Sequence, residues 1–136
     1  RLKQAADLHS NRLSQWLVLQ QLEAPGRSAR LAGLADFYRR KRDLFAAALE
    51  RHFKDLATWE TPAGGLFFWL TLKQRIDTRQ LLPLAIESGV AFMPGEAFYP
   101  DTPDATGTLR LNFSHAGEDE IDRGLAKLAE LVKGCV

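Results

Sequence analysis

The chain has 136 residues, of which 46% are hydrophobic and 26% are charged, and this composition is typical of one globular domain with its own core. Its formal net charge of +1 gives no long-range attraction to nucleic acid or to a membrane surface. No apolar run approaches the roughly 18 residues of a transmembrane helix. The single cysteine, Cys135, cannot form an internal disulfide, which fits a cytoplasmic protein.

The first part of the chain predicts two helices separated by a break. Ser10 can cap a helix that runs to about Ala24, and Pro25-Gly26 then ends it. The following segment repeats its larger side chains at three- and four-residue steps, which predicts a helix of roughly 25 residues. The side chains on this face are Leu31, Leu34, Ala35, Tyr38, Phe45, Ala48, Leu49 and His52.

Four consecutive basic residues, 39–42, lie inside this long helix. Basic clusters can bind nucleic acid through its phosphates. Asp36, Asp43 and Glu50 lie close enough along the helix to balance the positive charge, and no aromatic side chains are interleaved with it. A solvated helix face is the favoured interpretation.

Two strands are expected next. Residues 57–60 form a short one, and residues 66–72 are almost continuously apolar, which predicts a strand in the centre of its sheet. Gly64 and Gly65 precede this second strand. They either allow another group to approach the backbone closely or simply form a tight turn, and the sequence leaves both interpretations open.

A helix and a short strand follow. Asp77 and Gln80 predict the start of the helix through a variant capping box, and Gly89 suits its end. Residues 90–93 predict a strand that Pro94-Gly95 ends.

Residues 95–107 then predict a long loop. Loops of this length tend to be functional or mobile. This one carries Phe98 and Tyr99, two large aromatic side chains that need a surface to cover.

The segment 108–114 alternates strictly between apolar and polar side chains, which predicts a strand buried on one face. The polar face carries a guanidinium flanked by two small hydrogen-bonding side chains. A guanidinium matches a carboxylate or a phosphate through two parallel hydrogen bonds, although an ion pair with a surface acid is the simpler alternative. The apolar residues are Leu109, Leu111 and Phe113, and the polar residues are Arg110, Asn112 and Ser114.

A last helix begins near Glu118, because acidic residues enrich its first turn. The predicted order is helix, long helix, two strands, helix, two strands and helix. It predicts an α+β fold in which helices pack on one small antiparallel or mixed sheet. The core face of the last helix consists of Ile121, Leu125, Leu128, Ala129 and Val132.

The residues alone indicate no catalytic centre. His9, His52 and His115 lie far apart in the sequence, and none has metal-ligand spacing to a second donor. The chain has no glycine pattern of the dinucleotide-binding or P-loop type. A catalytic triad is disfavoured, because the adjacent Ser114 and His115 point to opposite faces of a strand.

Four segments in register carry a resemblance to a known family. Residues 3–10, 62–69, 89–98 and 109–114 occur in the same order and at similar spacing in pyridoxal-phosphate (PLP)-dependent aminotransferases of the aspartate aminotransferase fold. The whole chain, 1–136, resembles their C-terminal small domain. It is most similar to the branch that includes 2-aminoadipate and related broad-specificity aminotransferases.

The resemblance implies roles for residues on the polar face of this strand and for one aromatic residue. Arg110 matches the arginine that binds the α-carboxylate of the substrate in this family. Asn112 and Ser114 lie on the same face of the strand and could hold the guanidinium or line the cleft. Phe67 matches a position that faces the substrate, although a core aromatic is the ordinary interpretation.

The catalytic lysine of the family is missing from the chain. In this family the cofactor forms a Schiff base with a lysine in a Ser-x-x-Lys context, in a large PLP-binding domain that precedes the segment present here. We therefore expect the chain by itself to be inert, and the parent protein to transfer an amino group between an amino acid and a 2-oxo acid. None of its lysines stands in such a context: Lys3, Lys41, Lys54, Lys73, Lys127 and Lys133.

Two other identities of the chain remain open alternatives. The chain could be the C-terminal part of a GntR/MocR-type transcription regulator, in which an aminotransferase-like module senses a ligand and a separate domain binds nucleic acid. It could also be a stand-alone binding domain.

The resemblance further implies a homodimeric parent. The start at Arg1 suggests a piece of a longer chain or a removed tag, and in such a piece the face around Trp16 would be an exposed former interface.

Overall fold

The computed structural model describes residues 11–101 and 106–135. They form two compact units, the first ending at Asp36 and the second beginning at Phe37. In the described part of the chain, no helix combines the length and the apolar character needed to cross a membrane.

The first unit contains helix α2 (Arg12–Glu23) and the start of helix α3 (Arg27–Phe53). The predicted cap Ser10 lies outside the described residues. Asn11 caps α2, and its side chain accepts a hydrogen bond of 3.0 Å from the backbone N–H of Ser14. No residue of α2 is buried.

Helix α3 confirms the predicted long helix, with 27 residues. Its part within the second unit buries Phe45, Ala48, Leu49 and Phe53. Two of the consecutive basic residues are engaged inside the fold. Lys41 donates to the backbone oxygens of His115 and Ala116, and Arg42 donates to Asp43 and to the backbone oxygen of Pro62. These contacts favour a structural use of the basic stretch.

A four-stranded sheet forms the middle of the second unit, and its strand order is β1-β2-β4-β3. All neighbouring strands are antiparallel. The predicted central position of the apolar strand is confirmed, since β2 has a neighbour on each side. Its residues nevertheless alternate between exposed and buried, because helices cover only one face of the sheet. The strands are β1 (Ala57–Trp59), β2 (Phe67–Leu72), β3 (Met93–Pro94) and β4 (Thr108–Asn112).

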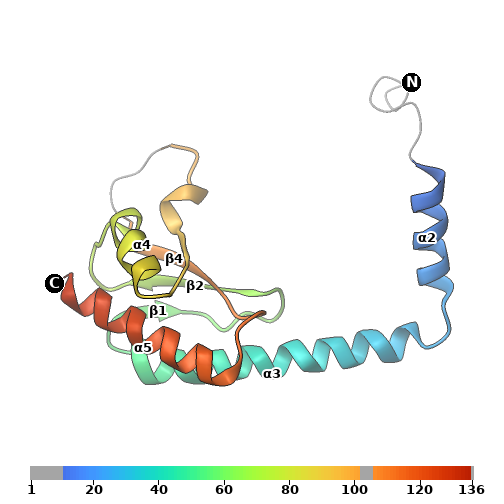
Figure 1. Cartoon of the computed structure of the whole chain (residues 1–136), viewed down its shortest axis with the longest axis horizontal. Helices are drawn as coiled ribbons and strands as arrows, with labels where there is room; N and C mark the ends of the chain where they lie inside the picture. Colours follow the sequence, from blue (N-terminus) through green and yellow to red (C-terminus); the bar gives the residue numbers. More distant parts are fainter. Residues whose placement is uncertain (1–10, 102–105, 136) are drawn as a thin grey trace. The chain divides into compact units, whose positions relative to one another are not determined.

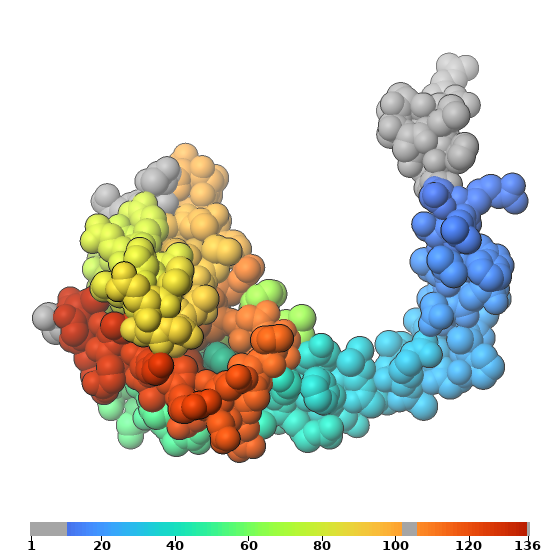
Figure 2. Space-filling model, viewed as in Figure 1, coloured from blue at the N-terminus to red at the C-terminus, as the bar shows by residue number. Residues whose placement is uncertain are grey.

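The covered face of the sheet holds the core, as the α+β prediction requires. Helix α3 packs on it together with α4 (Thr78–Glu87) and α5 (Glu118–Gly134), and Figure 1 shows α5 beside the last part of α3. Asp122 joins these two helices, since it accepts hydrogen bonds from Arg51 and His52. In Figure 2, α5 (red) lies against α4 (yellow). The strands contribute Ala57, Phe68, Leu70, Leu72, Leu109, Leu111 and the adjacent Phe113 to this core.

Helix α4 confirms both of its predicted ends. The Asp77 side chain accepts from the backbone N–H of Arg79 at 3.0 Å, and Gly89, just beyond the helix, has a φ of 78°, a conformation that glycine adopts without strain. Gly65 also has a positive φ, and a side chain on Gly64 or Gly65 would meet no neighbouring atom. The tight-turn interpretation therefore fits this pair of glycines.

The predicted strand 90–93 is wrong in its position. The backbone N–H of Val90 donates to Ala85 at 2.8 Å and so completes the end of α4. The strand that forms is β3, Met93–Pro94, at the edge of the sheet. An edge strand tolerates proline, because the N–H that proline lacks is not needed for pairing on the open side. The segment expected to be a loop begins with a 3-10 helix, η1 (Gly95–Phe98).

Candidate functional site

Arg110 lies on the face of the sheet that α3, α4 and α5 leave uncovered. It is the middle residue of β4, and its backbone pairs with Trp69 of β2 on one side and with Met93 of β3 on the other. These neighbours share its face, and both are partly exposed, Trp69 by 38% and Met93 by 43%. The alternation seen in the sequence therefore places the guanidinium as expected, away from the core.

The guanidinium of Arg110 lies against two aromatic rings. Its Cζ atom is 4.1 Å from the centre of the Phe67 ring and 4.7 Å from the centre of the Phe98 ring. Cation–π contacts of this kind fix the plane of the guanidinium without using its N–H groups. Within the described residues, Arg110 makes no hydrogen bond or ion pair with another side chain. Its donors are thus available to a planar anion such as a carboxylate.

Asn112 and Ser114 do not hold the guanidinium. The Asn112 Oδ1 atom accepts two hydrogen bonds of 2.7 Å, from the backbone N–H and the hydroxyl of Ser114. This closed pair terminates the strand. Asn112 faces Phe67 across the β2–β4 ladder, so Phe67 shares the surface on which the sequence placed Arg110 and Asn112. Whether they contact a substrate stays a prediction.

Phe98 belongs to the aromatic loop that the sequence predicted to be functional or mobile, but its contact with Arg110 was not predicted. It is the last residue of η1. Besides Arg110, its ring contacts Trp69 edge to face, with ring centres 5.4 Å apart. Phe67, Trp69 and Phe98 therefore form an aromatic surface around one guanidinium. The signal in the sequence was a large aromatic side chain in a loop, because such a side chain needs an apolar surface to cover.

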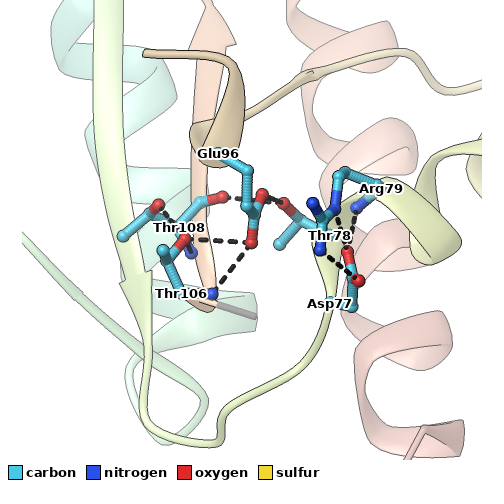
Figure 3. A network of polar contacts seen from close by, with 6 residues as sticks. All are labelled: Asp77, Thr78, Arg79, Glu96, Thr106 and Thr108. Carbon is cyan, nitrogen blue, oxygen red and sulfur yellow. Dashed lines mark hydrogen bonds and ion pairs between the residues drawn. The ribbon is translucent and has the colours of Figure 1, made fainter. Parts of the chain in front are cut away.

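A buried carboxylate anchors η1 beneath this aromatic surface. Glu96 is only 5% exposed, and Figure 3 shows its carboxylate between Thr78 on one side and Thr106 and Thr108 on the other. Thr78 Oγ1 donates to Glu96 Oε2 at 2.5 Å. Thr106 donates to Glu96 Oε1 twice, from its backbone N–H and from its hydroxyl, both at 2.9 Å. No pattern in the sequence predicts this network, because its members come from separate segments.

The pKa of Glu96 reflects two opposing causes. Burial raises the pKa of the carboxyl, because it penalises the ionised form. The hydrogen bonds from Thr78 and Thr106 favour the ionised form and outweigh burial, so the pKa of Glu96 lies below its ordinary value. Glu96 is therefore an ionised, fully partnered group at neutral pH.

A groove of about 700 Å³ lies elsewhere in the second unit, beside the start of α5. Phe45, His115 and Ile121 line it, Asn112 borders it, and Arg110 is not part of it. We place the candidate site at Arg110 and not in this groove. A guanidinium with available donors selects an anionic ligand, whereas a mostly apolar groove selects no particular ligand class.

The described lysines do not form a cofactor site. Lys41, Lys73 and Lys127 each donate to backbone oxygens, and Lys133 pairs with Glu130 at 2.8 Å. Lys54 is exposed, and Lys127, which lines the groove beside α5, donates to the Ser88 backbone oxygen at an exposed position. A lysine that forms a Schiff base needs a secluded pocket of low polarity, and these surroundings do not provide one. Within residues 11–101 and 106–135, no group of three or more His, Cys, Asp or Glu side chains is arranged to hold a metal ion.

Comparison with known proteins gives relatives along almost the whole chain. The chain is 38% identical over 131 residues to aromatic-amino-acid aminotransferase 1 of Thermococcus litoralis, which covers 96% of this chain and 31% of that protein. It also resembles an uncharacterised HTH-type transcriptional regulator of Bacillus subtilis, YdfD, at 24% identity over 132 residues, or 97% of this chain and 27% of that protein. The chain thus spans about a third of the length of the curated relatives it matches.

Solved structures agree with these relatives. The kynurenine aminotransferase of Pyrococcus horikoshii, in complex with PMP, superimposes with a TM-score of 0.88 at 37% identity, over 98% of this chain and 33% of that one. The α-aminoadipate aminotransferase LysN of Thermus thermophilus, complexed with N-(5'-phosphopyridoxyl)-L-leucine, gives a TM-score of 0.83 at 34% identity, over 98% and 34% of the two chains. The predicted fold is confirmed.

The family model described as aminotransferase class I and II matches residues 2–128. The match covers the sheet, α3 and α4, and it includes the surface around Arg110. The resemblance seen in the sequence is thereby confirmed, and the chain belongs to the class I and II aminotransferase family.

Proposed function

We propose that the chain is the C-terminal small domain of a PLP-dependent aminotransferase, and that Arg110 binds the α-carboxylate of the amino-acid substrate. One observation carries the proposal. The guanidinium of Arg110 is held by the rings of Phe67 and Phe98, while its N–H donors make no hydrogen bond to any of the described residues. An arginine used for an ordinary surface ion pair would instead have a carboxylate partner.

The geometry suits recognition of a carboxylate. Two aromatic rings restrict the plane of the guanidinium, so that less freedom is lost when two parallel hydrogen bonds form. Apolar rings also exclude water, which strengthens a charge-assisted pair. A carboxylate fixed in this way orients the rest of the amino acid. Phe67 and Asn112, on the same surface, would line the substrate side.

The cofactor belongs to the part of the protein outside this chain. When bound, PLP supplies the electron sink for amino-group transfer. Four of the described lysines are engaged in other contacts and Lys54 is exposed, so we expect this chain to contribute substrate binding and no covalent chemistry. We expect the chain alone to be inert, and a longer protein with a large domain to transfer an amino group between an amino acid and a 2-oxo acid.

The remaining features of the parent follow from the same proposal. We infer a homodimer located in the cytoplasm, with amino acids and 2-oxo acids as its small-molecule partners. The family membership supports this description.

A ligand-sensing regulator is the second candidate. The similarity to YdfD at 24% identity favours it, but the similarity to an aminotransferase at 38% identity is stronger. In a regulator, Arg110 would bind the same carboxylate for sensing, and a separate domain would bind nucleic acid.

The coding region upstream of Arg1 separates these candidates. A Ser-x-x-Lys segment there, together with transamination by the longer protein and none by the 136-residue chain, is the expected result. A winged-helix segment further upstream would move the function to regulation. A start codon directly before Arg1, or transamination by this chain with added PLP, would contradict the proposal.

A further inference from the structure

Helix η1 lies along strand β4 on the Arg110 face. Thr108 and Arg110 are two residues apart in β4, so their side chains project from the same face. Gly95, at the start of η1, packs directly on Thr108. Phe98, at its end, lies on the guanidinium of Arg110. The four residues of η1 therefore connect the Gly95–Thr108 contact at one end to the candidate site at Arg110 at the other.

Glu96 ties this short helix to two other segments of the chain. Thr78 comes from the first turn of α4, and Thr106 comes from the segment that leads into β4. Thr106 also bonds Thr108, with 2.6 Å between their hydroxyl oxygens. The carboxylate thus links η1 to α4 and to β4 at once (Figure 3).

A loss of these bonds would be unfavourable. An ionised carboxylate that is 5% exposed needs its hydrogen-bond partners, because an uncompensated buried charge is strongly disfavoured. Displacement of η1 from β4 would separate Glu96 from Thr78 or Thr106. The network therefore restrains η1, and with it the ring of Phe98.

We propose that Glu96 is a positioning residue for Arg110: its hydrogen bonds to Thr78 and Thr106 keep η1 on β4, so that the Phe98 ring stays on the guanidinium. Without the Phe98 ring, the guanidinium would be restrained only by Phe67 and could leave the orientation that suits a planar anion. The use of this arrangement for a substrate carboxylate rests on the proposed function, whereas the positioning itself does not.

The test uses nuclear magnetic resonance of the 136-residue chain with isotope-labelled arginine. The Arg110 Nε–Hε signal, assigned by its loss in Arg110→Lys, senses the ring currents of Phe67 and Phe98. Phe98→Leu gives the position of this signal without the second ring. Glu96→Gln should move the signal towards that position. Glu120→Gln is the matched control, since Glu120 accepts a hydrogen bond of 2.8 Å from the backbone N–H of Gly117 and lies outside the network.

An Arg110 signal that keeps its wild-type position in Glu96→Gln would overturn the proposal. An equal displacement in Glu120→Gln would also overturn it, since the effect would then be a general loss of stability. If Glu96→Gln does not fold, Thr78→Val should displace the signal and Thr78→Ser should not, because serine keeps the hydroxyl. Unfolding of both Glu96→Gln and Thr78→Val would count against the proposal, since the network would then support the whole fold.

Kinetics of the longer protein test the use of this arrangement. Glu96→Gln should raise the KM for the amino acid about threefold, with a smaller change in kcat, because a cation–π contact in a partly exposed site is modest. An unchanged KM beside a displaced Arg110 signal would confirm the positioning and contradict its use in substrate binding. A longer protein without transaminase activity would overturn the proposed function and leave the spectroscopic result to decide the positioning.

Discussion

Gly95 and Thr108 are in such close contact that no side chain fits between η1 and β4. A Cβ atom on Gly95 would overlap the Thr108 hydroxyl, and it would lie 2.6 Å from the Thr108 Cβ and 2.8 Å from its carbonyl carbon. Backbone atoms of a central strand cannot move aside. Glycine is therefore required at this position for its lack of volume, and the contact determines how closely η1 approaches Arg110.

Gly95→Ala should destabilise the chain and move η1. We expect a loss of about 2 kcal/mol in the free energy of unfolding, the usual cost of overpacking a filled site, measured by urea denaturation. Gly64→Ala is the matched control, because a Cβ atom there would meet no neighbour, and it should change the stability by less than about 0.5 kcal/mol. Equal stability of the two variants would contradict the close packing of η1 against β4.

Glu96 should give the chain a stability that is lost in acid. Burial raises its pKa, but the hydrogen bonds from Thr78 and Thr106 outweigh burial, so the folded pKa lies below the ordinary value of 4.5. A group with a lowered folded pKa stabilises the fold above its unfolded pKa, and this contribution disappears as the pH falls through the folded pKa.

The measurement compares the wild-type chain with Glu96→Gln. The difference in their free energies of unfolding should stay constant above the unfolded pKa and shrink as the pH is lowered below it. Other carboxylates contribute equally to both proteins and cancel in the difference. A difference that grows in acid would mean that burial dominates and that Glu96 is protonated in the folded chain.

Helix α2 should cause self-association of the isolated chain. It buries none of its residues, and Trp16 is 55% exposed and Leu19 47%. Exposed apolar surface of this kind is usually covered by another protein surface. Sedimentation velocity should show oligomers that increase with concentration, and Trp16→Gln combined with Leu19→Gln should reduce them.

The matched control for α2 lies in the second unit. Leu84 and Ile86 of α4 are 46% and 56% exposed, and their replacement by glutamine removes a similar amount of apolar surface. It should leave the association unchanged. A wild-type chain that stays monomeric at high concentration would contradict the prediction.

Local patterns in the sequence were sufficient for most of the fold and for the face of Arg110. The period of two in residues 108–114 placed Arg110 opposite Leu109 and Leu111, because successive side chains of a strand project to opposite faces. The ends of α4 were predictable for the same reason, since the cap Asp77 and Gly89 act on backbone groups a few residues away.

Contacts between distant segments were beyond such patterns. Glu96 meets Thr78 across 18 positions of the sequence, and no period relates the two. Phe98 reaches Arg110 only because this network holds η1 on β4. The strand predicted at 90–93 failed through a similar competition, since Val90 uses its N–H to complete α4 and leaves only Met93–Pro94 to pair with β4.

The Arg110→Lys variant of the longer protein tests the carboxylate-binding role of Arg110. Lysine keeps the charge but lacks the planar fork that forms two parallel hydrogen bonds. We expect a loss of about 3 kcal/mol, or about 100-fold in kcat/KM, for an amino-acid substrate. We expect no loss for an amine without a carboxylate, which has nothing for Arg110 to bind. Equal losses with both substrates, or no loss with the amino acid, would contradict the assignment of Arg110 as the carboxylate-binding residue.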